Sequence, residues 1–247
     1  MTTLKGLNQR ECLADPQRKQ LYVTVMFDEI APRYDRFTRW FSYGLDSGWK
    51  GEVLKQIQEA ANSAPAIRQG LDIACGTGDL ARLLAEAMPG VTIAGVDISP
   101  VMIACAQPHP QVVYRVGDAT RLEEADGSVQ VVTIGYGLRN LPDYMQGLRE
   151  IHRVLAPGSL LGILEFTRPE TVLWRWIFLG YLWLAGTIYG WWWHGHGPVY
   201  GYIARSIARF ATRRELTAQL GSLGFDIICQ GSHLGGGVAV IVARKRA

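Results

Sequence analysis

From residue 70 onward, short apolar runs alternate with amphipathic segments. The runs cover 71–75, 92–97, 112–117, 129–137 and 160–166. Each has the length of a strand and is apolar almost throughout, which is typical of strands buried on both faces of a parallel sheet. The segments between them read as helices, for example DLARLLAEAM (79–88) and DYMQGLREIHRVL (143–155). Strands joined by helices in this way predict a doubly wound α/β fold.

The end of the chain predicts a hairpin that closes this sheet. In TRRELTAQLGSLGF, Thr212 and Glu215 have the spacing of a capping box, and Gly224 can end the helix that they begin. Two further apolar runs, 225–231 and 237–245, are joined by a short Gly-rich link, which favours antiparallel pairing. The fold prediction is therefore Rossmann-like: a mostly parallel seven-stranded sheet with a C-terminal antiparallel hairpin.

Two regions lie outside the alternating pattern. Residues 21–61 read as helices separated by turns, so we predict an N-terminal helical cap over 1–62 and a sheet domain over 63–247. Within the sheet domain, residues 170–210 form an insertion between the fifth strand and the last helix. Six of the eight tryptophans lie in this insertion.

Composition narrows the class of protein. Hydrophobic residues make up 48% and charged residues 19% of the chain, as in globular proteins. The formal charge of +3 comes without the dense Lys/Arg stripe of a nucleic-acid binder, so no nucleic-acid partner is expected. The four cysteines, Cys12, Cys75, Cys105 and Cys229, lie far apart with no CxxC spacing. They indicate neither a disulfide framework nor a zinc site, and they fit a cytoplasmic location.

Histidines do not change this view of metals. His194 and His196 flank Gly195 in a Gly-rich stretch, but no nearby cysteine or acidic residue completes a ligand set. His152 falls inside a predicted amphipathic helix, where a surface or hydrogen-bonded position is expected. We therefore predict no metal site.

Glycines and acidic residues at the strand ends predict a nucleotide site. The first strand runs into Gly76 and Gly78, which allow a sharp turn and a close approach of the backbone to a ligand. Asp97 ends the next strand, where a carboxylate can accept hydrogen bonds from two ribose hydroxyls. Asp118 follows the third strand and reaches the same edge of the sheet. The three features together predict a nucleoside-type cofactor.

The form of the glycine loop favours one cofactor. The loop lacks the third glycine that packs the helix against the pyrophosphate of NAD. Asp72, four residues before Gly76, is unfavourable beside a diphosphate but suits the positively charged end of S-adenosylmethionine. We therefore predict an S-adenosylmethionine-dependent methyltransferase.

Several longer blocks resemble one family. VMFDEIAPRYDRFTRWFSYGLDSGWK (25–50), IGYGLRN (134–140) and IHRVLAPGSLLGILEFTRP (151–169) resemble segments of the ubiquinone/menaquinone biosynthesis C-methyltransferases of the UbiE/MenG type. The blocks occur in the family's order and cover nearly the whole chain. The resemblance implies a class I methyltransferase that methylates a ring carbon of a prenylated quinol, either demethylmenaquinol or a ubiquinol precursor.

The resemblance also implies residue roles. Contacts to S-adenosylmethionine would fall on Thr77, Asp97, Asp118, Ala119 and Gly135. The residues facing the methyl group and the substrate ring would be Tyr34, Arg139 and Asn140. Arg139 would hold the developing phenolate charge and, with Asn140, orient a water that carries the proton away.

The chain departs from the family pattern on the substrate side. YDRFT replaces YDxMN, Gly135 stands where a serine is commoner, and Thr167 replaces a serine. The Trp-rich insertion also replaces a polar region. Two alternatives therefore stay open: methylation of another hydrophobic acceptor, such as an aminophospholipid or a terpenoid, and a non-catalytic subunit that binds S-adenosylmethionine.

The segment from Trp176 to Trp193 contains no charged residue. A single membrane span here would separate the C-terminal hairpin from its own sheet, so we do not predict one. The position after the fifth strand instead predicts a hood over the methyl donor that admits a lipid-like substrate. Trp and Tyr favour membrane interfaces, so we expect residues 174–193 to contact the inner face of a bilayer. The alternative is a hood that packs only on its own domain or on a second subunit of a homodimer.

Overall fold

Seven strands form one sheet in the order β3-β2-β1-β4-β5-β7-β6. The structure is a computed structural model that describes residues 9–12, 15–42, 44–194 and 198–247. Strands β1 to β5 pair in parallel, and β7 runs antiparallel to both β5 and β6. The predicted Rossmann-like fold and its C-terminal hairpin are thus confirmed. The strands are β1 (Gln69–Ile73), β2 (Thr92–Asp97), β3 (Val112–Val116), β4 (Val129–Gly135), β5 (Leu155–Phe166), β6 (Phe225–His233) and β7 (Val238–Lys245).

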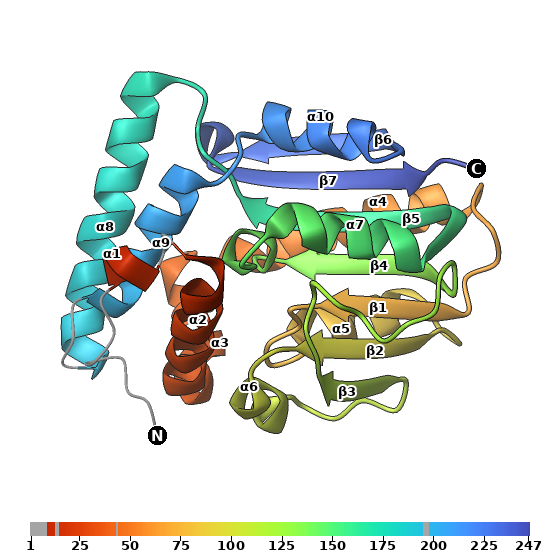
Figure 1. The fold of residues 1–247 in the computed structure, drawn as a ribbon, viewed down its shortest axis with the longest axis horizontal. Coiled ribbons are helices and arrows are strands. Elements are labelled where there is room, and N and C mark those ends of the chain that lie inside the picture. The colour runs from red at the N-terminus through yellow and green to blue at the C-terminus, as the bar shows by residue number, and fades with distance from the viewer. Residues whose placement is uncertain (1–8, 13–14, 43, 195–197) are drawn as a thin grey trace.

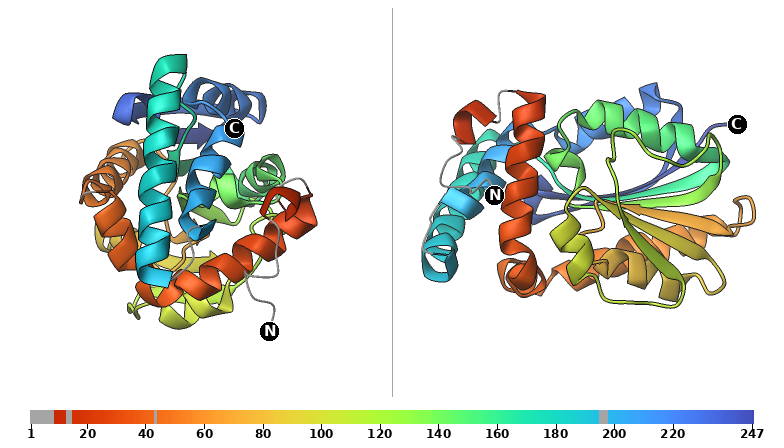
Figure 2. Two further views of the ribbon diagram at one scale, coloured as in Figure 1. Left: turned by 90° about the vertical axis from the view of Figure 1, so that its left-hand side faces the viewer. Right: turned by 60° about the horizontal axis from the view of Figure 1, so that its bottom comes forward.

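Helices cover both faces of the sheet (Figures 1 and 2). On one face lie α4 (Asp46–Ala61) and α5 (Asp79–Ala87), and on the other lie α7 (Tyr144–Val154) and α10 (Arg213–Ser222). The predicted capping box of α10 is present, because the Thr212 side chain accepts from the Glu215 N–H while the Glu215 side chain accepts from the Thr212 N–H. Residues Leu148 and Ile151 of α7 are fully buried against the sheet.

The N-terminal helices divide between the sheet and its edge. Helix α4 packs on β5 and β7, and Gly162 of β5 leaves the space that Ile57 occupies. This helix, which the sequence placed in the N-terminal cap, is therefore part of the sheet layers. Helices α1 (Gln9–Cys12), α2 (Pro16–Ile30) and α3 (Tyr34–Phe41) lie instead beyond the carboxyl ends of the parallel strands (Figure 1). Their position puts them over the edge where ligands of such sheets bind.

The insertion forms two helices at the same edge. Helix α8 (Val172–His194) and helix α9 (Pro198–Arg209) run side by side across the end of the sheet (Figure 2). Phe178 and Leu182 on α8 are buried against the protein. Among residues 172–188 of this helix, whose side chains the structure describes, nine large apolar residues are exposed: Val172, Leu173, Trp174, Trp176, Ile177, Tyr181, Trp183, Leu184 and Ile188. Among the helices of the described residues, none combines the length and apolarity that crossing a membrane requires.

Helix α6 (Pro100–Cys105) completes the edge. Ser99 caps it by accepting a hydrogen bond from the Met102 N–H, with Pro100 at its first position. Ser99 also donates to Asp28 of α2. The helix that follows β2 is thereby joined to the N-terminal helices above the sheet edge.

Candidate active site

Asp97 ends β2 and joins two neighbouring segments. Its Oδ2 accepts from the Gly76 N–H at 2.9 Å, and its Oδ1 accepts from the Ser99 N–H at 2.9 Å. Burial raises the pKa of this carboxyl, while the N–H groups of Ser99 and Gly76 act in the opposite direction. The glycine loop and the start of α6 are therefore held at the tip of β2 by one carboxylate.

Asp118 lies at the same edge and contacts α2. Its Oδ1 accepts from the Thr120 N–H at 2.8 Å and from the Thr120 hydroxyl at 2.7 Å, and its Oδ2 accepts from Gln20 Nε2 at 3.0 Å. Burial alone would raise the pKa of Asp118, but the hydrogen bonds from Thr120 and Gln20 bring it below its usual value. The charged form of Asp118 therefore helps to hold α2 over the edge of the sheet.

An apolar cavity of about 650 Å³, counting the open space at its mouth, lies between α2, α3 and the ends of the strands. Met102, Ile98 and Leu141 give it apolar walls. Seven of the residues singled out from the sequence line it: Tyr34, Gly76, Asp97, Asp118, Ala119, Gly135 and Asn140. The cavity therefore offers an apolar slot with two carboxylates at its rim, which suits a nucleoside.

A second, more polar cavity of about 1400 Å³, also counting open space, adjoins the first. Asp72 and Thr77 line it, together with the ionic groups of Lys50 and Asp79. The two cavities share five lining residues: Tyr34, Ala74, Gly76, Gly135 and Tyr136. We call the region of these five residues the junction. A ligand that extends from one cavity into the other has to pass it.

Asp72 has one carboxylate oxygen available to a ligand. Its Oδ1 accepts from the Thr133 hydroxyl at 2.7 Å, and its Oδ2 has no hydrogen-bond partner in the described part of the chain. The residue is 1% exposed, and burial raises the pKa of its carboxyl to about 7. A buried carboxylate of this kind is stabilised by a cation, which fits the ammonium end of an amino-acid-like ligand.

The glycine loop provides close approach at one position and helix packing at another. Gly76 has φ +55° and lines both cavities. Gly78 has φ +78° and lines neither. A Cβ at Gly78 would collide with the Tyr114 ring, whose hydroxyl donates to the Gly78 carbonyl at 3.4 Å. Gly78 therefore allows α5 to begin close to β3. Of the two glycines, Gly76 is the one that lines the cavities.

Arg139 is held inside the protein. Its Nη1 lies 2.5 Å from Oε1 of Glu165 and 2.7 Å from the Tyr136 carbonyl oxygen, and its backbone N–H donates to Glu165 Oε2 at 3.0 Å. The guanidinium also lies over the Phe166 ring, 5.2 Å from its centroid. We expected Arg139 to face the substrate ring, but it lines neither cavity. The reason is Glu165. Its fully buried carboxylate is neutralised by the Arg139 guanidinium, and this ion pair holds the arginine inside the protein.

Asn140 and Tyr34 do reach the cavities. The Asn140 amide donates to the Tyr136 carbonyl at 2.9 Å, and its Oδ1 accepts from the Tyr202 hydroxyl of α9 at 3.1 Å. Tyr34, at the start of α3, lines both cavities, and burial raises the pKa of its phenol. Asn140 thus connects the cavity wall to the inserted helices.

Sequence reasoning missed the residues that support these groups. Lys19 of α2 donates to the Arg139 carbonyl at 3.0 Å, and its pKa is lowered to about 8 by burial and then by Arg139. Gln20, Tyr202 and Glu165 were missed for the same reason: each acts on a partner remote in sequence, and no local spacing marks such a pair. Glu165 lies in the LEF block that resembles the family, but the resemblance gave this residue no role.

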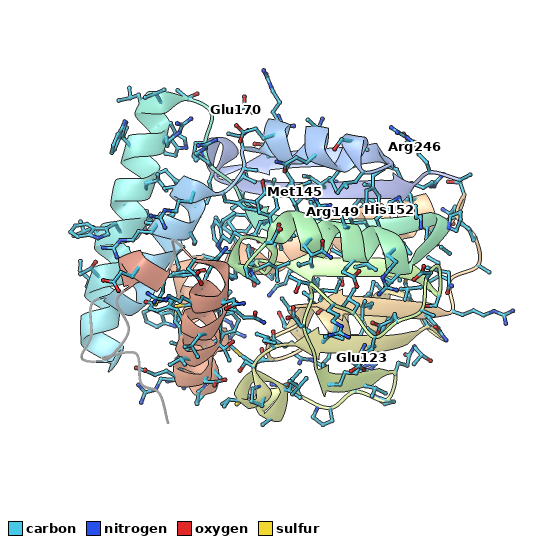
Figure 3. All side chains as sticks on the ribbon, in the orientation of Figure 1. Glu123, Met145, Arg149, His152, Glu170 and Arg246 are labelled. Atoms are coloured by element: carbon cyan, nitrogen blue, oxygen red, sulfur yellow. The ribbon has the colours of Figure 1, made fainter. Side chains whose placement is uncertain are left out.

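None of the histidines whose side chains the structure describes lines either cavity. His152 lies on α7 (Figure 3), where its ring packs edge-on against Phe225 with centroids 5.2 Å apart. His196 is outside the described residues, and the side chain of His194 is not described either. Among the described residues, no group of histidine, cysteine and acidic side chains is arranged to hold a metal ion.

Comparisons with known proteins point to one family. Residues 15–245 match the ubiE/COQ5 methyltransferase family. The demethylmenaquinone methyltransferase of Thermus thermophilus is 36% identical over 82% of this chain and 92% of the relative. The 2-phytyl-1,4-naphtoquinone methyltransferase of Thermosynechococcus vestitus is 35% identical over 90% and 99%. Among solved structures, a S-adenosylmethionine-dependent methyltransferase of Thermotoga maritima, described as a possible histamine N-methyltransferase, has a TM-score of 0.60 at 21% identity, covering 91% of this chain and all of that one.

Proposed function

The chain belongs to the ubiE/COQ5 methyltransferase family and uses S-adenosylmethionine, and from this premise we propose that it methylates a ring carbon of a prenylated quinol. The main support for the proposal is the activity by which two relatives are named, both of which match this chain over most of its length. One is a demethylmenaquinone methyltransferase and the other a 2-phytyl-1,4-naphtoquinone methyltransferase. The two joined cavities support it, because the apolar one can take a nucleoside, while the larger, polar one can take the amino-acid end of the cofactor and still adjoin an acceptor.

For the cofactor, we propose that the nucleoside occupies the apolar cavity. Asp97 accepts from the ribose hydroxyls, while Asp118 and the Ala119 backbone border the adenine. Asp72 and Thr77 bind the amino-acid end, and Gly76 and Gly135 allow close approach at the junction. The unpartnered Asp72 oxygen supports this assignment, because it needs a cation. When bound, S-adenosylmethionine supplies an electrophilic methyl group.

For the acceptor, we propose that the quinol ring lies at the junction against Tyr34 and Asn140. In-line methyl transfer needs a fixed distance and direction between donor and acceptor more than it needs covalent help from the protein. Asn140 is suited to orienting the ring, because Tyr202 and the Tyr136 carbonyl fix its amide. Arg139 acts as a positioning residue: its bonds to Glu165 and the Tyr136 carbonyl hold the turn Leu138–Asn140 in place.

The test is turnover with defined acceptors. Purified protein is incubated with methyl-labelled S-adenosylmethionine and, separately, reduced demethylmenaquinone, a reduced ubiquinone precursor, an aminophospholipid and a terpenoid. Label on a quinol ring carbon, located by mass spectrometry, is the expected result. Label only on a phospholipid or terpenoid would replace the quinol by one of the other acceptors. Tight cofactor binding without label on any acceptor would favour a non-catalytic subunit.

We further propose that α8 contacts the surface of a lipid bilayer. Its exposed residues include three tryptophans and a tyrosine, and Trp176 is 74% exposed. Amphipathic aromatic side chains of this kind favour the headgroup region, and a lipid-like substrate is present at a bilayer. Arg175 is the only charged residue within the helix, so no carboxylate opposes an anionic surface there.

Flotation with phosphatidylcholine/phosphatidylglycerol vesicles tests this contact. We expect the wild-type protein to float with the vesicles and Trp176→Asp/Leu184→Asp to remain behind. Val113→Asp is the matched control, because Val113 is a similarly exposed apolar residue on β3 (62% exposed). Equal flotation of all three proteins would rule out α8 as the contact. Loss of a dimer on light scattering in the double variant would show that a second copy of the chain covers this face.

A further inference from the structure

Tyr136 and Asp46 line the polar cavity, and each carries a buried oxygen, Tyr136 Oη and Asp46 Oδ1, that makes no well-aligned hydrogen bond in the described protein. Tyr136 is 7% exposed and Asp46 9%. Buried polar groups are nearly always satisfied, since an unmade hydrogen bond costs free energy. Two unsatisfied atoms on residues that line one cavity therefore call for a ligand or a chemical role.

The backbone of Tyr136 supports such a role. The residue follows β4 and has φ +57°, a left-handed conformation that residues other than glycine rarely adopt. Surrounding contacts enforce it: the Tyr136 carbonyl accepts from Arg139 and Asn140, and its ring packs on Phe166 with centroids 5.0 Å apart. Strain that is held in this way is concentrated at functional sites. This conformation keeps Tyr136 at the junction, where the residue lines both cavities.

The two carboxylate oxygens of Asp46 differ: Oδ2 is paired with Lys50, and Oδ1 makes no well-aligned hydrogen bond in the described protein. Lys50 Nζ lies 2.5 Å from Asp46 Oδ2 and 2.7 Å from Asp79 Oδ2, and Lys50 is itself buried. Lys50 is therefore the counter-ion of Asp46 as well as of Asp79. The second oxygen, Oδ1, is therefore the unused acceptor of an ion-paired carboxylate.

The two residues act on each other electrostatically. Burial holds the pKa of the Tyr136 phenol well above its usual range; the charge of the Asp46 carboxylate and its hydrogen-bonding contact with the phenol are the next largest causes, followed by Tyr34 and Glu165. The phenol therefore keeps its proton at neutral pH. A protonated phenol beside a carboxylate can pass a proton on without ever holding a full negative charge.

We propose that Tyr136 and Asp46 remove the proton of the acceptor hydroxyl. This inference rests on the proposed function, in which ionisation of that hydroxyl makes the ring carbon nucleophilic. The acceptor O–H proton moves to Tyr136 Oη as the phenol proton moves to Asp46 Oδ1, and the electron pair of the broken O–H bond stays on the acceptor oxygen. After methylation, the ring carbon loses its hydrogen as a proton to solvent, and the pair of that C–H bond restores the aromatic ring. The proton on Asp46 then returns through Tyr136 to the acceptor oxygen, so one proton is released per turnover.

Other candidates for this step are occupied. Arg139 is a permanent cation that is already bound to Glu165 and lines neither cavity. Asp72 also has an unpartnered oxygen, but we assign it to the cationic end of the cofactor. Asp79 is bound to Lys50 and to Arg82. Asp46 is therefore the lining carboxylate left for the acceptor.

The test compares Tyr136→Phe and Asp46→Asn with Ser47→Ala, a control at the same cavity. With reduced demethylmenaquinone, we expect kcat to fall about 100-fold or more in the first two and to stay within about threefold in the control. The dissociation constant of S-adenosylmethionine, measured by calorimetry, should stay within about threefold in all three. Tyr136→Phe removes one oxygen and keeps the ring that packs on Phe166, so it should fold like the wild type, and it decides the question if Asp46→Asn does not fold.

A more acidic acceptor separates proton removal from a structural role. A halogenated naphthohydroquinone ionises more easily, so it should narrow the kcat gap between wild type and Tyr136→Phe by at least about tenfold. An unchanged gap would mean that Tyr136 acts only by shape. Normal turnover by Tyr136→Phe would overturn the relay while leaving the proposed function standing. No turnover of any quinol by the wild type would overturn both.

Discussion

Replacing Glu165 with glutamine removes one charge from a fully buried ion pair while keeping the side-chain shape. Glu165 is not exposed at all, and the Arg139 side chain is only 6% exposed. The carboxylate accepts three hydrogen bonds, from the Arg139 N–H, Arg139 Nη1 and the Phe166 N–H. In Glu165→Gln the guanidinium keeps its positive charge in an environment that no longer neutralises it.

The expected loss of stability follows from this burial. Removing one partner of a buried pair costs about 3–5 kcal/mol, because the other charge is left uncompensated. The total stability of a protein is about 5–15 kcal/mol, so a large share of it is at risk. At about 2–4 °C per kcal/mol for a domain of this size, Tm should fall by about 6–20 °C.

Urea unfolding followed by tryptophan fluorescence measures the change, and a double variant provides the control. Arg139→Met/Glu165→Gln removes both charges, so it should recover at least about half of the stability that Glu165→Gln loses. A loss below about 1 kcal/mol in Glu165→Gln would show that water or another group compensates Arg139. A double variant as unstable as the sum of the two single variants would show that the ion pair is not the reason for the loss.

Four further predictions concern the cofactor and the hood. Because burial raises the pKa of Asp72 to about 7, its carboxyl is neutral below this pH and charged above it. Calorimetry should therefore show that the affinity for S-adenosylmethionine rises from about pH 6 to about pH 8 in the wild type but not in Asp72→Asn. An acid whose folded-state pKa is raised destabilises the fold above its unfolded pKa, so Asp72→Asn without cofactor should be more stable than wild type at about pH 8, with the advantage fading towards about pH 4. Asp97→Ala should weaken cofactor binding about tenfold to a hundredfold in the same assay, because it removes charged acceptors from the rim of the cavity. Tyr202→Phe should lower kcat/KM for the quinol about twofold to tenfold, since Asn140 loses one hydrogen bond; no change would separate the hood from the active site.

The fold could be predicted because its signals are local or periodic. Apolar runs at strand spacing located the strands, and the Thr212–Glu215 pair marked a helix start. The acidic residue Asp97 could be assigned to the sheet edge because parallel strands end there together. None of these inferences required knowledge of contacts between remote segments.

The Arg139–Glu165 pair could not be predicted in this way. Whether the two side chains meet depends on the register of β4 and β5, in which Gly135 lies opposite Leu164. A shift of one residue would turn Glu165 to the other face of the sheet, away from Arg139. The sequence contains both residues but not the register, so an arginine in a substrate-side block was assigned to the substrate.

Asp46 was missed for a related reason. The sequence placed residues 1–62 together as a cap, whereas α4 packs along the sheet and brings its first residue to the polar cavity. The packing depends on Gly162, which leaves room for Ile57 and Val53 above β5. A glycine inside an apolar strand carries this information only when the helix that will cover it is known.

The inserted helices belong to the wall of the site as well as to its surface. Tyr202 is almost fully buried and bonds to Asn140, Ile207 is fully buried, and the Arg168 N–H donates to the Ala211 carbonyl where the insertion begins and ends. Deleting 170–210 would therefore leave Asn140 Oδ1 without its donor and uncover apolar surface of the sheet. A deletion that abolished turnover would say nothing about lipid contact. Only substitutions on the outward face, such as Trp176 and Leu184, can separate docking of the hood from its role in holding Asn140.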